Sequence, residues 1–299
     1  MYYNTKPWNC EQCTFNNTKS YYKCDICNYE LEMYSLDIPD YLLEKQKLDQ
    51  NNSVDYKMFT NEYIFLPVID VVNYELTLKN CQICFENGAD GVWLINHSIA
   101  HKELLEIFKK IRIIYPEKWI GLNIMDLYIH DIFNKIQDWN IKIDGIWTDN
   151  SYINTTNPIQ NIANIIQLNK IRSGWKGLYF GSIAFKYHPL RIELSKPENL
   201  SKISQLATKY IDVITSSGAE TNIAMDIDKA RIIKENIKSK ALAIASGINI
   251  DNCHQYKPYC KFYLVSSSLK INIEDALFDP IKIKNLANKI HELVKQNKN

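Results

Sequence analysis

The chain has 299 residues, of which 46% are hydrophobic and 23% are charged, and these proportions are ordinary for a folded globular protein. Lysine and arginine together number 35 against 34 acidic residues, so the net charge of +1 gives no global basic field for nonspecific binding to nucleic acid or anionic membrane. Disordered, collagen-like and fibrous classes are therefore excluded, and the length allows one large domain with a small one.

The sequence also bears on the compartment of the protein. It contains no apolar run of the roughly 18 residues that a transmembrane helix needs, and its first residues lack the apolar core of a secretory signal. Four of the 8 cysteines fall within 18 residues as two Cys-x-x-Cys pairs, a spacing typical of a metal site in a reducing compartment. We expect a cytoplasmic or nuclear protein with no membrane partner.

The two cysteine pairs lie near the N-terminus and predict a structural zinc site. Their members are Cys10, Cys13, Cys24 and Cys27. Four thiolates arranged as two close pairs can surround one Zn²⁺ as a tetrahedron. A segment of about 25 residues cannot bury a sufficient core, so metal binding would supply most of its folding free energy. We expect a small zinc finger over residues 1–32.

Further positions in this segment match a known family. Trp8 lies two residues before the first cysteine of the motif, and Asn17 lies four after the second. The segment thereby resembles the NZF, or Ran-binding-protein type, zinc finger. Ubiquitin-binding members of that family resemble one another in a Thr-Phe pair after the second cysteine and an apolar residue before the fourth, positions held here by Thr14, Phe15 and Ile26. The resemblance implies ubiquitin or a ubiquitylated protein as a partner.

Two alternatives to ubiquitin binding stay open for this finger. Other members of the family bind single-stranded RNA, but an RNA-binding finger should carry arginines, and only Lys19 and Lys23 lie between the second and third cysteines. RNA is therefore the less favoured partner. In the other alternative, Phe15 and Ile26 pack on the following linker. That linker is polar, covers residues 33–60 and could form a short helix capped by Asp40.

From Tyr63 onward, eight short β-rich runs alternate with longer amphipathic stretches, at a spacing of roughly 20 to 35 residues. This alternation predicts a (β/α)8 barrel, or TIM barrel, over residues 61–299; a doubly wound open sheet is the alternative. Among the helices, we expect one from Tyr74 to Asn87 capped by Asn73, one from His101 to Ile114 and one from Met225 to Lys238. Pro67 lacks a backbone donor, so a local bulge is expected in the first strand.

Four segments of this domain resemble the BtpA family of barrel proteins, which is related in style to phosphoribosyl-isomerase barrels. They are Leu66-Pro-Val-Ile, Glu86-Asn-Gly-Ala-Asp-Gly-Val-Trp-Leu-Ile-Asn, Asp212-Val-Ile-Thr-Ser-Ser-Gly and Ala245-Ser-Gly-Ile. The family is associated with photosystem assembly, and the resemblance implies a barrel but no particular activity. Its usual members lack a zinc finger, so the fusion argues against a photosynthetic role here.

Active sites of such barrels lie at the carboxyl ends of the strands, and all eight of these ends are polar here. The candidate catalytic residues are Asp70, His97, Asp126, Asp149 and Lys186. The candidate substrate-binding residues are Asn96, Asn123, Asn150, Thr215, Ser216, Ser217, Gly218, Ser246, Gly247, Ser266 and Ser267. These acids, amides and hydroxyls would all lie around the opening of the barrel at the carboxyl ends of the strands, here called the mouth. Such a concentration of polar groups favours a ligand-binding or active site there.

Individual roles follow from residue type and strand position. Asp70 and Asp149 are expected to face each other across a sugar as general acid and base, or as charge stabilisers. His97 and Lys186 would transfer protons or bind anions, and Asp126 could instead cap the next helix. Phosphate sites in this fold usually follow the seventh and eighth strands, where the small Ser-Gly and Ser-Ser segments lie.

Other residues favour structural roles. Cys81, Cys84, Cys253 and Cys260 are expected to be core residues and not a second zinc site. Asp90 precedes the second strand at the opposite end of the barrel and is expected to be structural. The sequence holds no P-loop, nucleophile elbow or GxGxxG pattern, and it indicates no nicotinamide or flavin cofactor.

Together these features favour a ubiquitin-binding enzyme whose barrel acts on a phosphorylated ribose or nucleotide, for example by hydrolysing an ADP-ribosyl or phosphoribosyl linkage on ubiquitin. One alternative is a non-catalytic ubiquitin-reading adaptor or metabolite sensor. Another is a sugar-phosphate isomerase or an RNA-associated protein. The reaction type and the oligomeric state stay open at this point.

Overall fold

The computed structural model describes residues 8–9, 16–17, 54–153, 158–188, 190–272 and 276–292; residues 8–9, 16–17, 158–160, 162–163 and 166 are described by their backbone alone. The chain divides into two compact units, Met1–Lys47 and Leu48–Asn299. In the first unit, β1 (Trp8–Asn9) pairs antiparallel with β2 (Asn16–Asn17), so that Trp8 lies opposite Asn17. The predicted zinc ligands Cys10, Cys13, Cys24 and Cys27 and the predicted ubiquitin contacts Thr14, Phe15 and Ile26 lie outside the described residues.

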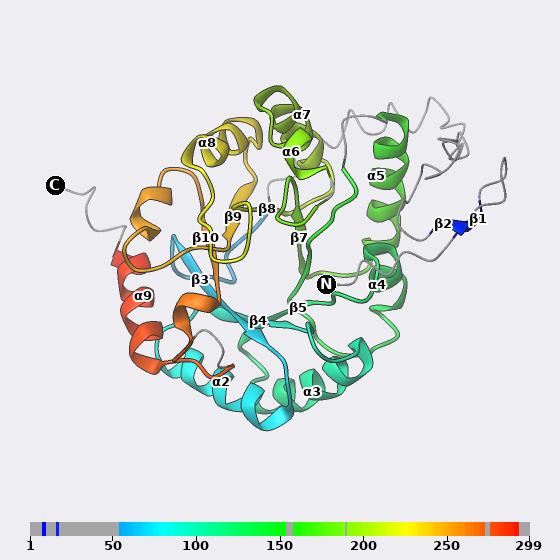
Figure 1. The fold of residues 1–299 in the computed structure, drawn as a ribbon. Coiled ribbons are helices and arrows are strands. Elements are labelled where there is room, and N and C mark those ends of the chain that lie inside the picture. The colour runs from blue at the N-terminus through cyan, green and yellow to red at the C-terminus, as the bar shows by residue number, and fades with distance from the viewer. Residues whose placement is uncertain are drawn as a thin grey trace. The chain divides into compact units, whose positions relative to one another are not determined.

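The second unit is a closed barrel of eight parallel strands, as predicted (Figure 1). The strands are β3 (Ile64–Asp70), β4 (Gly91–Ile95), β5 (Trp119–Asn123), β6 (Gly145–Thr148), β7 (Leu178–Ser182), β8 (Val213–Ser217), β9 (Ala241–Ala245) and β10 (Phe262–Val265). Pairing of β10 with both β9 and β3 closes the ring, which rules out the open sheet. Pro67 lies opposite Val265 in an uninterrupted register, so the expected bulge is absent and that prediction was wrong.

The helices surround the barrel on its outside (Figure 1). They are α2 (Tyr74–Glu86), α3 (His101–Ile114), α4 (Ile129–Lys135), α5 (Pro158–Arg172), α6 (Arg191–Leu194), α7 (Pro197–Ala207), α8 (Ile227–Asn236) and α9 (Pro280–Glu292). Two short 3₁₀ helices, η1 (Cys253–Tyr256) and η2 (Ser267–Leu269), flank β10. Among the described residues, every helix is too short or too polar to cross a membrane.

Capping side chains set two helix starts. The Asn73 side chain accepts a hydrogen bond from the backbone N–H of Leu76, which confirms the predicted cap of α2, and Gly88 follows the helix at a φ of +95°. The Asp226 side chain accepts from the backbone N–H of Lys229, so α8 starts two residues later than predicted. These caps satisfy N–H groups that the first helical turn leaves unpaired.

Aromatic rings fill the inside of the barrel. Trp93, Trp119 and Phe180 meet with ring centroids 4.9 to 6.1 Å apart, mostly edge to face. Inward-facing glycines make room for the rings: a Cβ atom on Gly121 would lie 2.3 Å from the Trp93 ring. Large side chains on some strands thus face small ones on their neighbours, and the barrel is a packed core with no open channel.

Residues 54–60, predicted as part of the linker, close the amino end of this barrel. Phe59 is buried against Trp119 and Phe262, with ring centroids 5.5 Å apart in both pairs. The Tyr56 hydroxyl donates to the carbonyl of Asp212 and accepts from the backbone N–H of Ala241. The packing of the barrel therefore begins before residue 61.

Three aspartates join neighbouring strands at this same end. Each one immediately precedes a strand and accepts the backbone N–H of the second residue of the strand before it; the pairs are Asp90 with Phe65, Asp144 with Ile120 and Asp212 with Tyr179. Each aspartate also contacts a basic side chain from a covering helix; these partners are His291, Arg112 and Arg172, respectively. The structural role predicted for Asp90 is confirmed, and it recurs at Asp144 before β6 and at Asp212 before β8.

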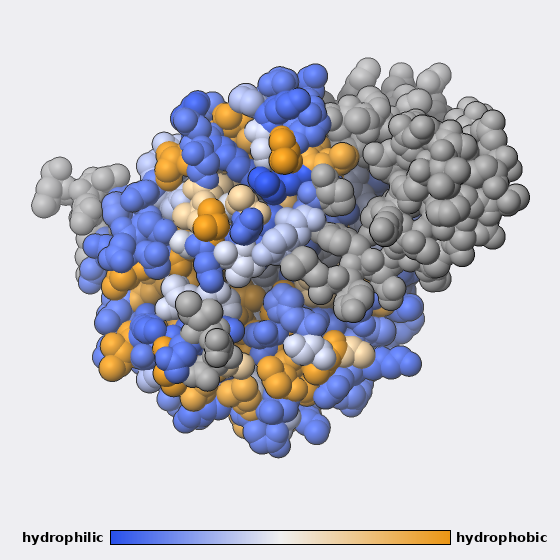
Figure 2. Space-filling view, viewed as in Figure 1, coloured by the Kyte–Doolittle hydropathy of each residue, from blue (hydrophilic) through white to orange (hydrophobic). Residues whose placement is uncertain are grey.

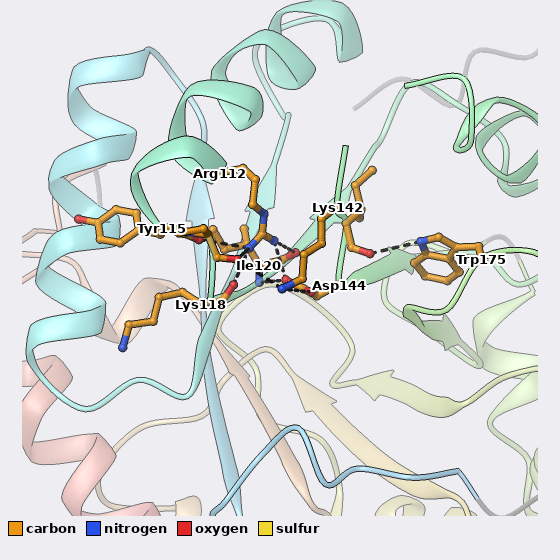
Figure 3. A network of polar contacts seen from close by, with 9 residues as sticks. Arg112, Tyr115, Lys118, Ile120, Lys142, Asp144 and Trp175 are labelled. Carbon is orange, nitrogen blue, oxygen red and sulfur yellow. Dashed lines mark hydrogen bonds and ion pairs between the residues drawn. The ribbon is translucent and has the colours of Figure 1, made fainter. Parts of the chain in front are cut away.

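The contact between Arg112 and Asp144 is the centre of the network in Figure 3. Arg112 reaches from α3 and lies 2.5 Å from an oxygen of Asp144, and it also donates to the carbonyls of Tyr115, Pro116 and Lys118. Its side chain is only 9% exposed. The guanidinium therefore holds together the end of α3, the turn that follows it and the start of two strands.

The cysteines of the barrel are core residues, as predicted. Cys81 and Cys84 are fully buried on α2, and Cys253 and Cys260 are buried beside β10. Burial raises the pKa of both the Cys81 thiol and the Cys260 thiol to about 12, which opposes formation of the thiolate that a zinc ligand requires.

Candidate functional site

Alternation along the strands decides which polar residues enter the barrel mouth. Side chains of a strand point alternately into the barrel and out toward the helices. Trp119, Trp147, Phe180 and Val213 belong to the cluster that fills the barrel. Every second residue further along these strands also faces inward, and at the carboxyl ends these residues are Asn123, Asp149, Ser182, Thr215 and Ser217. By the same alternation, Asp70 at the end of β3 and His97 after the end of β4 face into the mouth.

Asp70 and His97 form a pair at one side of the mouth. The Nδ1 atom of His97 lies 3.1 Å from an oxygen of Asp70, and the two side chains are 53% and 27% exposed, respectively. Burial alone would raise the pKa of Asp70, but the hydrogen bond and the charge of His97, with a smaller contribution from Lys270, hold it below the usual carboxyl value. Asp70 is therefore an ionised carboxylate with an imidazole beside it.

Asp149 lies in the opposite electrostatic environment. An oxygen of Asp149 accepts a hydrogen bond of 3.1 Å from the side-chain amide of Asn123, which is itself buried. Part of Asp149 stays open to the mouth, yet burial raises its pKa above the usual carboxyl value, against the lowering effects of Lys186, Asn123 and His97. Because His97 acts on both carboxyls, Asp70 and Asp149 belong to one electrostatic cluster.

A loop after β7 covers part of this mouth. Phe185 is 1% exposed and packs on Trp147, with ring centroids 6.0 Å apart. The next residue, Lys186, donates its backbone N–H to the Ser217 hydroxyl and its ammonium to the Thr221 hydroxyl. The loop thus places a cation beside Asp149 and an aromatic ring over the interior. Ala184, which precedes this ring, has a φ of +44°, a conformation that is costly for a residue with a Cβ atom.

Asp126 and Asn96, two of the predicted site residues, bind to the polypeptide itself. The Asp126 carboxylate accepts hydrogen bonds from the side-chain amide of Asn96 and from the backbone N–H of His101. It also lies 2.8 Å from the imidazole of His101. The first residue of α3 is His101, so Asp126 caps the helix before it in the chain and not the next one. Asn96 further bonds the backbone of Ile99 and Met125. These two residues hold loops together.

Two further candidates bond to nearby backbone. The Ser216 hydroxyl donates to the carbonyl of Ile183 and is fully buried on the outer side of β8. The Asn150 side chain accepts from the backbone N–H of Tyr152, an Asx turn that shapes the loop after β6. Ser216 faces outward because it lies one position along β8 from the inward-facing Ser217, whereas Asn150 follows the end of β6 and is bonded within its own loop.

The loops after β9 and β10 lie side by side, because Leu264 pairs with Ala245. Ser246, Gly247, Ser266 and Ser267 are partly exposed there, and Ser268 joins the loops through a 2.7 Å bond to the carbonyl of Ile248. Gly247 has a φ of +67°, and a Cβ atom on it would lie 2.2 Å from the backbone of Ala224. A Cβ on Gly218 would likewise lie 2.1 Å from the carbonyl oxygen of Ile223. Backbone packing therefore accounts for both glycines.

Some residues near the mouth escaped the sequence analysis. His101 gave no signal, since its partner Asp126 lies on another loop. Phe185 looked like an ordinary apolar residue. Lys229 lies on α8, yet its ammonium reaches the carbonyls of Ala184 and Ser217 at 2.6 and 2.8 Å. Only the fold brings these groups to the carboxyl ends of the strands.

Figure 2 shows the molecule from the side seen in Figure 1, and apolar residues appear there as islands in a mostly hydrophilic surface. The exposed apolar side chains in the loops at the carboxyl ends include Val72, Met125, Tyr187 and Ile271. A mouth with an apolar and polar rim suits a small ligand with both characters.

Comparison with solved structures returns enzymes of the same fold. N-(5'-phosphoribosyl)anthranilate isomerase from Pyrococcus furiosus is 13% identical, with a TM-score of 0.53 over 76% of this chain and 98% of that one. Orotidine 5'-phosphate decarboxylase from Pyrococcus horikoshii is 10% identical, with a TM-score of 0.54 over 78% and 99%. (S)-3-O-geranylgeranylglyceryl phosphate synthase from Thermoplasma acidophilum, in complex with sn-glycerol-1-phosphate, is 11% identical, with a TM-score of 0.53 over 85% and 98%.

Likeness at this level of identity shows the fold alone. All three neighbours are enzymes named for a compound that carries a phosphate group. The sequence matches no family model and no curated protein. The resemblances to the NZF finger and to the BtpA family therefore stay predictions from the motifs.

Proposed function

We propose that the barrel mouth binds a phosphorylated ribose or nucleotide and that Asp149 acts at the ribose as the general acid. The observation that carries this proposal is the opposite environment of two carboxyls in one mouth. Burial raises the pKa of Asp149, whereas His97 holds the pKa of Asp70 low. Two carboxyls whose pKa values are pushed apart can supply a proton donor and an ionised carboxylate at the same pH.

The different roles of the two carboxyl groups follow from these environments. Asp149 donates a proton to the oxygen that leaves the ribose, and Asp70 stabilises the positive charge that develops at the sugar, or takes up a proton through His97. Asn123, bonded to Asp149, orients the acid. Hydrolysis of a ribosyl linkage and isomerisation of a sugar phosphate could both use this pair, and they differ in whether a water molecule is consumed.

The phosphate is proposed to lie against the loops after β9 and β10. These are the seventh and eighth strands of the barrel, the usual place of a phosphate in this fold. Their partly exposed residues are small, so backbone N–H groups can approach an anion there. The phosphorylated compounds in the names of the structural neighbours support this choice.

Calorimetric titration of the full chain with ribose 5-phosphate and with ribose tests the phosphate site. We expect Ser266→Asp to weaken binding of ribose 5-phosphate by at least about tenfold, because it places a like charge against the phosphate. Ser173→Asp adds the same charge on an exposed residue after α5 and should leave binding unchanged. Equal affinity for ribose and ribose 5-phosphate would overturn the proposed site.

We further propose that residues 1–32 form the zinc finger and that Thr14, Phe15 and Ile26 bind ubiquitin. The cysteine spacing supports this, as does the pairing of Trp8 with Asn17, which brings together the two ends of the segment that contains the first cysteine pair. A ubiquitin reader joined to a catalytic mouth raises the local concentration of a ubiquitin-linked substrate. Removal of a ribosyl group from ubiquitin is the reaction that unites both parts.

Labelled ubiquitin titrated with the full chain and followed by NMR tests the partner. We expect resonance shifts confined to one apolar patch of ubiquitin, lost with Phe15→Ala and after zinc chelation. Tyr128→Ala, which removes an exposed aromatic ring at the barrel rim, is the matched control and should not change the shifts. Shifts that persist in Phe15→Ala would exclude the finger as the binding surface.

A further inference from the structure

A second hollow lies outside the barrel and shares Ser217 with the mouth. It has a volume of about 430 Å³ and lies between α6, α7 and α8, behind the carboxyl end of β8. Arg191 and Ser195 line it from α6 and the residue that follows, and Lys229 lines it from α8. Gly218 contributes backbone at its inner end. No role in the proposed reaction accounts for these residues.

Two cations meet in this hollow. Within the part of the chain that the structure describes, the Arg191 side chain has neither a hydrogen bond nor an ion pair. Lys229 is held by the carbonyls of Ala184 and Ser217 alone, which leaves one of its three N–H donors. Burial, and then the charge of Arg191, lower the pKa of Lys229 to about 7. Two like charges that line one hollow are stabilised when an anion lies between them.

Two carboxylates also line the hollow, but both have partners of their own. Asp226 caps α8 by accepting the backbone N–H of Lys229 at 3.1 Å. Asp228 lies 3.0 Å from Arg231 on the outer side of α8 and is largely exposed. Neither carboxylate forms an ion pair with Arg191 or Lys229 among the described residues. Asp226 attracts the ammonium of Lys229 electrostatically but does not contact it, so neither acid pairs with the two cations at contact distance.

A hydroxyl group completes the polar wall. The Oγ atom of Ser195 is buried and has no hydrogen-bond partner in the described part of the chain. An unpaired buried hydroxyl is costly, and a bound acceptor would remove that cost. The apolar part of the wall includes Pro197, Ile223 and Ile232. The hollow thus combines a cationic, hydrogen-bonding end with an apolar side.

We propose that this hollow binds a small phosphate monoester, with its phosphate between Arg191, Lys229 and the Ser195 hydroxyl and its apolar part against Ile223 and Ile232. A phosphate dianion matches the charge of Arg191, favours the charged form of Lys229 and offers several acceptors to the free donors. The volume leaves room for a compact organic group beside the phosphate. This is a binding site distinct from the phosphate site proposed at β9 and β10.

The position of Lys229 gives such binding a consequence for the barrel. The same ammonium holds the carbonyl of Ala184, the residue before Phe185, which covers the mouth. A phosphate bound to the Lys229 ammonium therefore changes the strength of the hydrogen bond from Lys229 to the carbonyl of Ala184, which holds this loop in place. By thermodynamic linkage, occupancy of the hollow and occupancy of the mouth affect each other's affinity.

Calorimetric titration of the full chain with phenyl phosphate, phenol and inorganic phosphate tests the site. We expect phenyl phosphate to bind more tightly than inorganic phosphate and phenol not to bind. Arg191→Gln should weaken the binding of phenyl phosphate by about 10- to 100-fold, the usual effect of removing a charge-assisted contact. Lys102→Gln removes an equal charge from an exposed position on α3 that does not line the hollow, and it is the control.

A second pair of variants separates this site from the barrel mouth. Arg191→Lys keeps the charge and should retain part of the affinity, which keeps the test valid even if Arg191→Gln folds poorly. Ser266→Asp, which should block the mouth, should leave the binding of phenyl phosphate intact. If Ser266→Asp abolishes the binding of phenyl phosphate and Arg191→Gln does not, the ligand binds in the mouth and not in the hollow. That result would overturn the inference and support the phosphate site in the mouth. No binding to the wild-type chain would also overturn it.

Discussion

Arg112→Met should lower the free energy of unfolding of the barrel by about 3–5 kcal/mol, the usual effect of breaking a buried ion pair by removing one partner. Methionine fills much of the same volume but donates no hydrogen bond. Asp144 then keeps its charge without the guanidinium, and the carbonyls of Tyr115 and Lys118 lose their donor. The Asp144 carboxylate also holds the backbone N–H of Ile120, so the disturbance reaches the start of β5.

Urea unfolding followed by tryptophan fluorescence measures this loss, since Trp93, Trp119 and Trp147 lie inside the barrel. Arg112→Lys should lie between the wild type and Arg112→Met, because an ammonium keeps the charge but cannot reproduce the fork of the guanidinium. Arg231→Met removes two exposed ion pairs on α8, with Asp228 and Glu235, and should cost less than about 1 kcal/mol. Equal effects at Arg112 and Arg231 would show that the buried network adds no more stability than exposed ion pairs do.

The fold follows from the sequence because its signals are local and repeated. Each strand is a short apolar run, and each helix has a stripe of apolar residues, so the count of eight could be made without knowledge of any contact. Asn73 even marks the start of a helix. The packing of residues 54–60 under the barrel could not be predicted in this way, because Tyr56 and Phe59 find their partners near Asp212 and Phe262, far along the chain.

The candidate site was predictable as a region but not residue by residue. All eight strand ends are polar, and that fact located the mouth. Which of two adjacent polar residues faces inward depends on where the strand ends, and strand ends are the least certain part of a sequence prediction. Asn123 and Asp149 thus belong to the mouth, whereas Asn150 and Ser216 bond to nearby backbone. The pairing of Asp126 with His101 needed the fold as well.

Asp149→Asn should lower kcat by about 100- to 10,000-fold on the phosphorylated ribose compound that the wild type turns over, since it removes the general acid. The same change should raise stability at neutral pH. Burial raises the pKa of Asp149, so the folded chain holds this proton more tightly than the unfolded chain. Tighter binding of this proton in the folded state adds to the free energy of unfolding at acidic pH, and this contribution is lost as the pH rises through the folded-state pKa of Asp149. Asparagine resembles the neutral acid and avoids this loss.

Two measurements on the same protein therefore identify the role of Asp149. Turnover of ribose 5-phosphate and of ADP-ribosylated ubiquitin, followed by NMR, gives kcat and KM, and urea unfolding between pH 4 and pH 8 gives stability. We expect a large fall in kcat, a small change in KM and a stability gain that grows with pH. Asp126→Asn, which weakens the cap of α3, should instead lose about 1 kcal/mol of stability and keep its activity. An unchanged kcat in Asp149→Asn would exclude Asp149 as the general acid. If the wild type binds these compounds without turning them over, the mouth recognises its ligand without transforming it, and the protein would be a metabolite sensor.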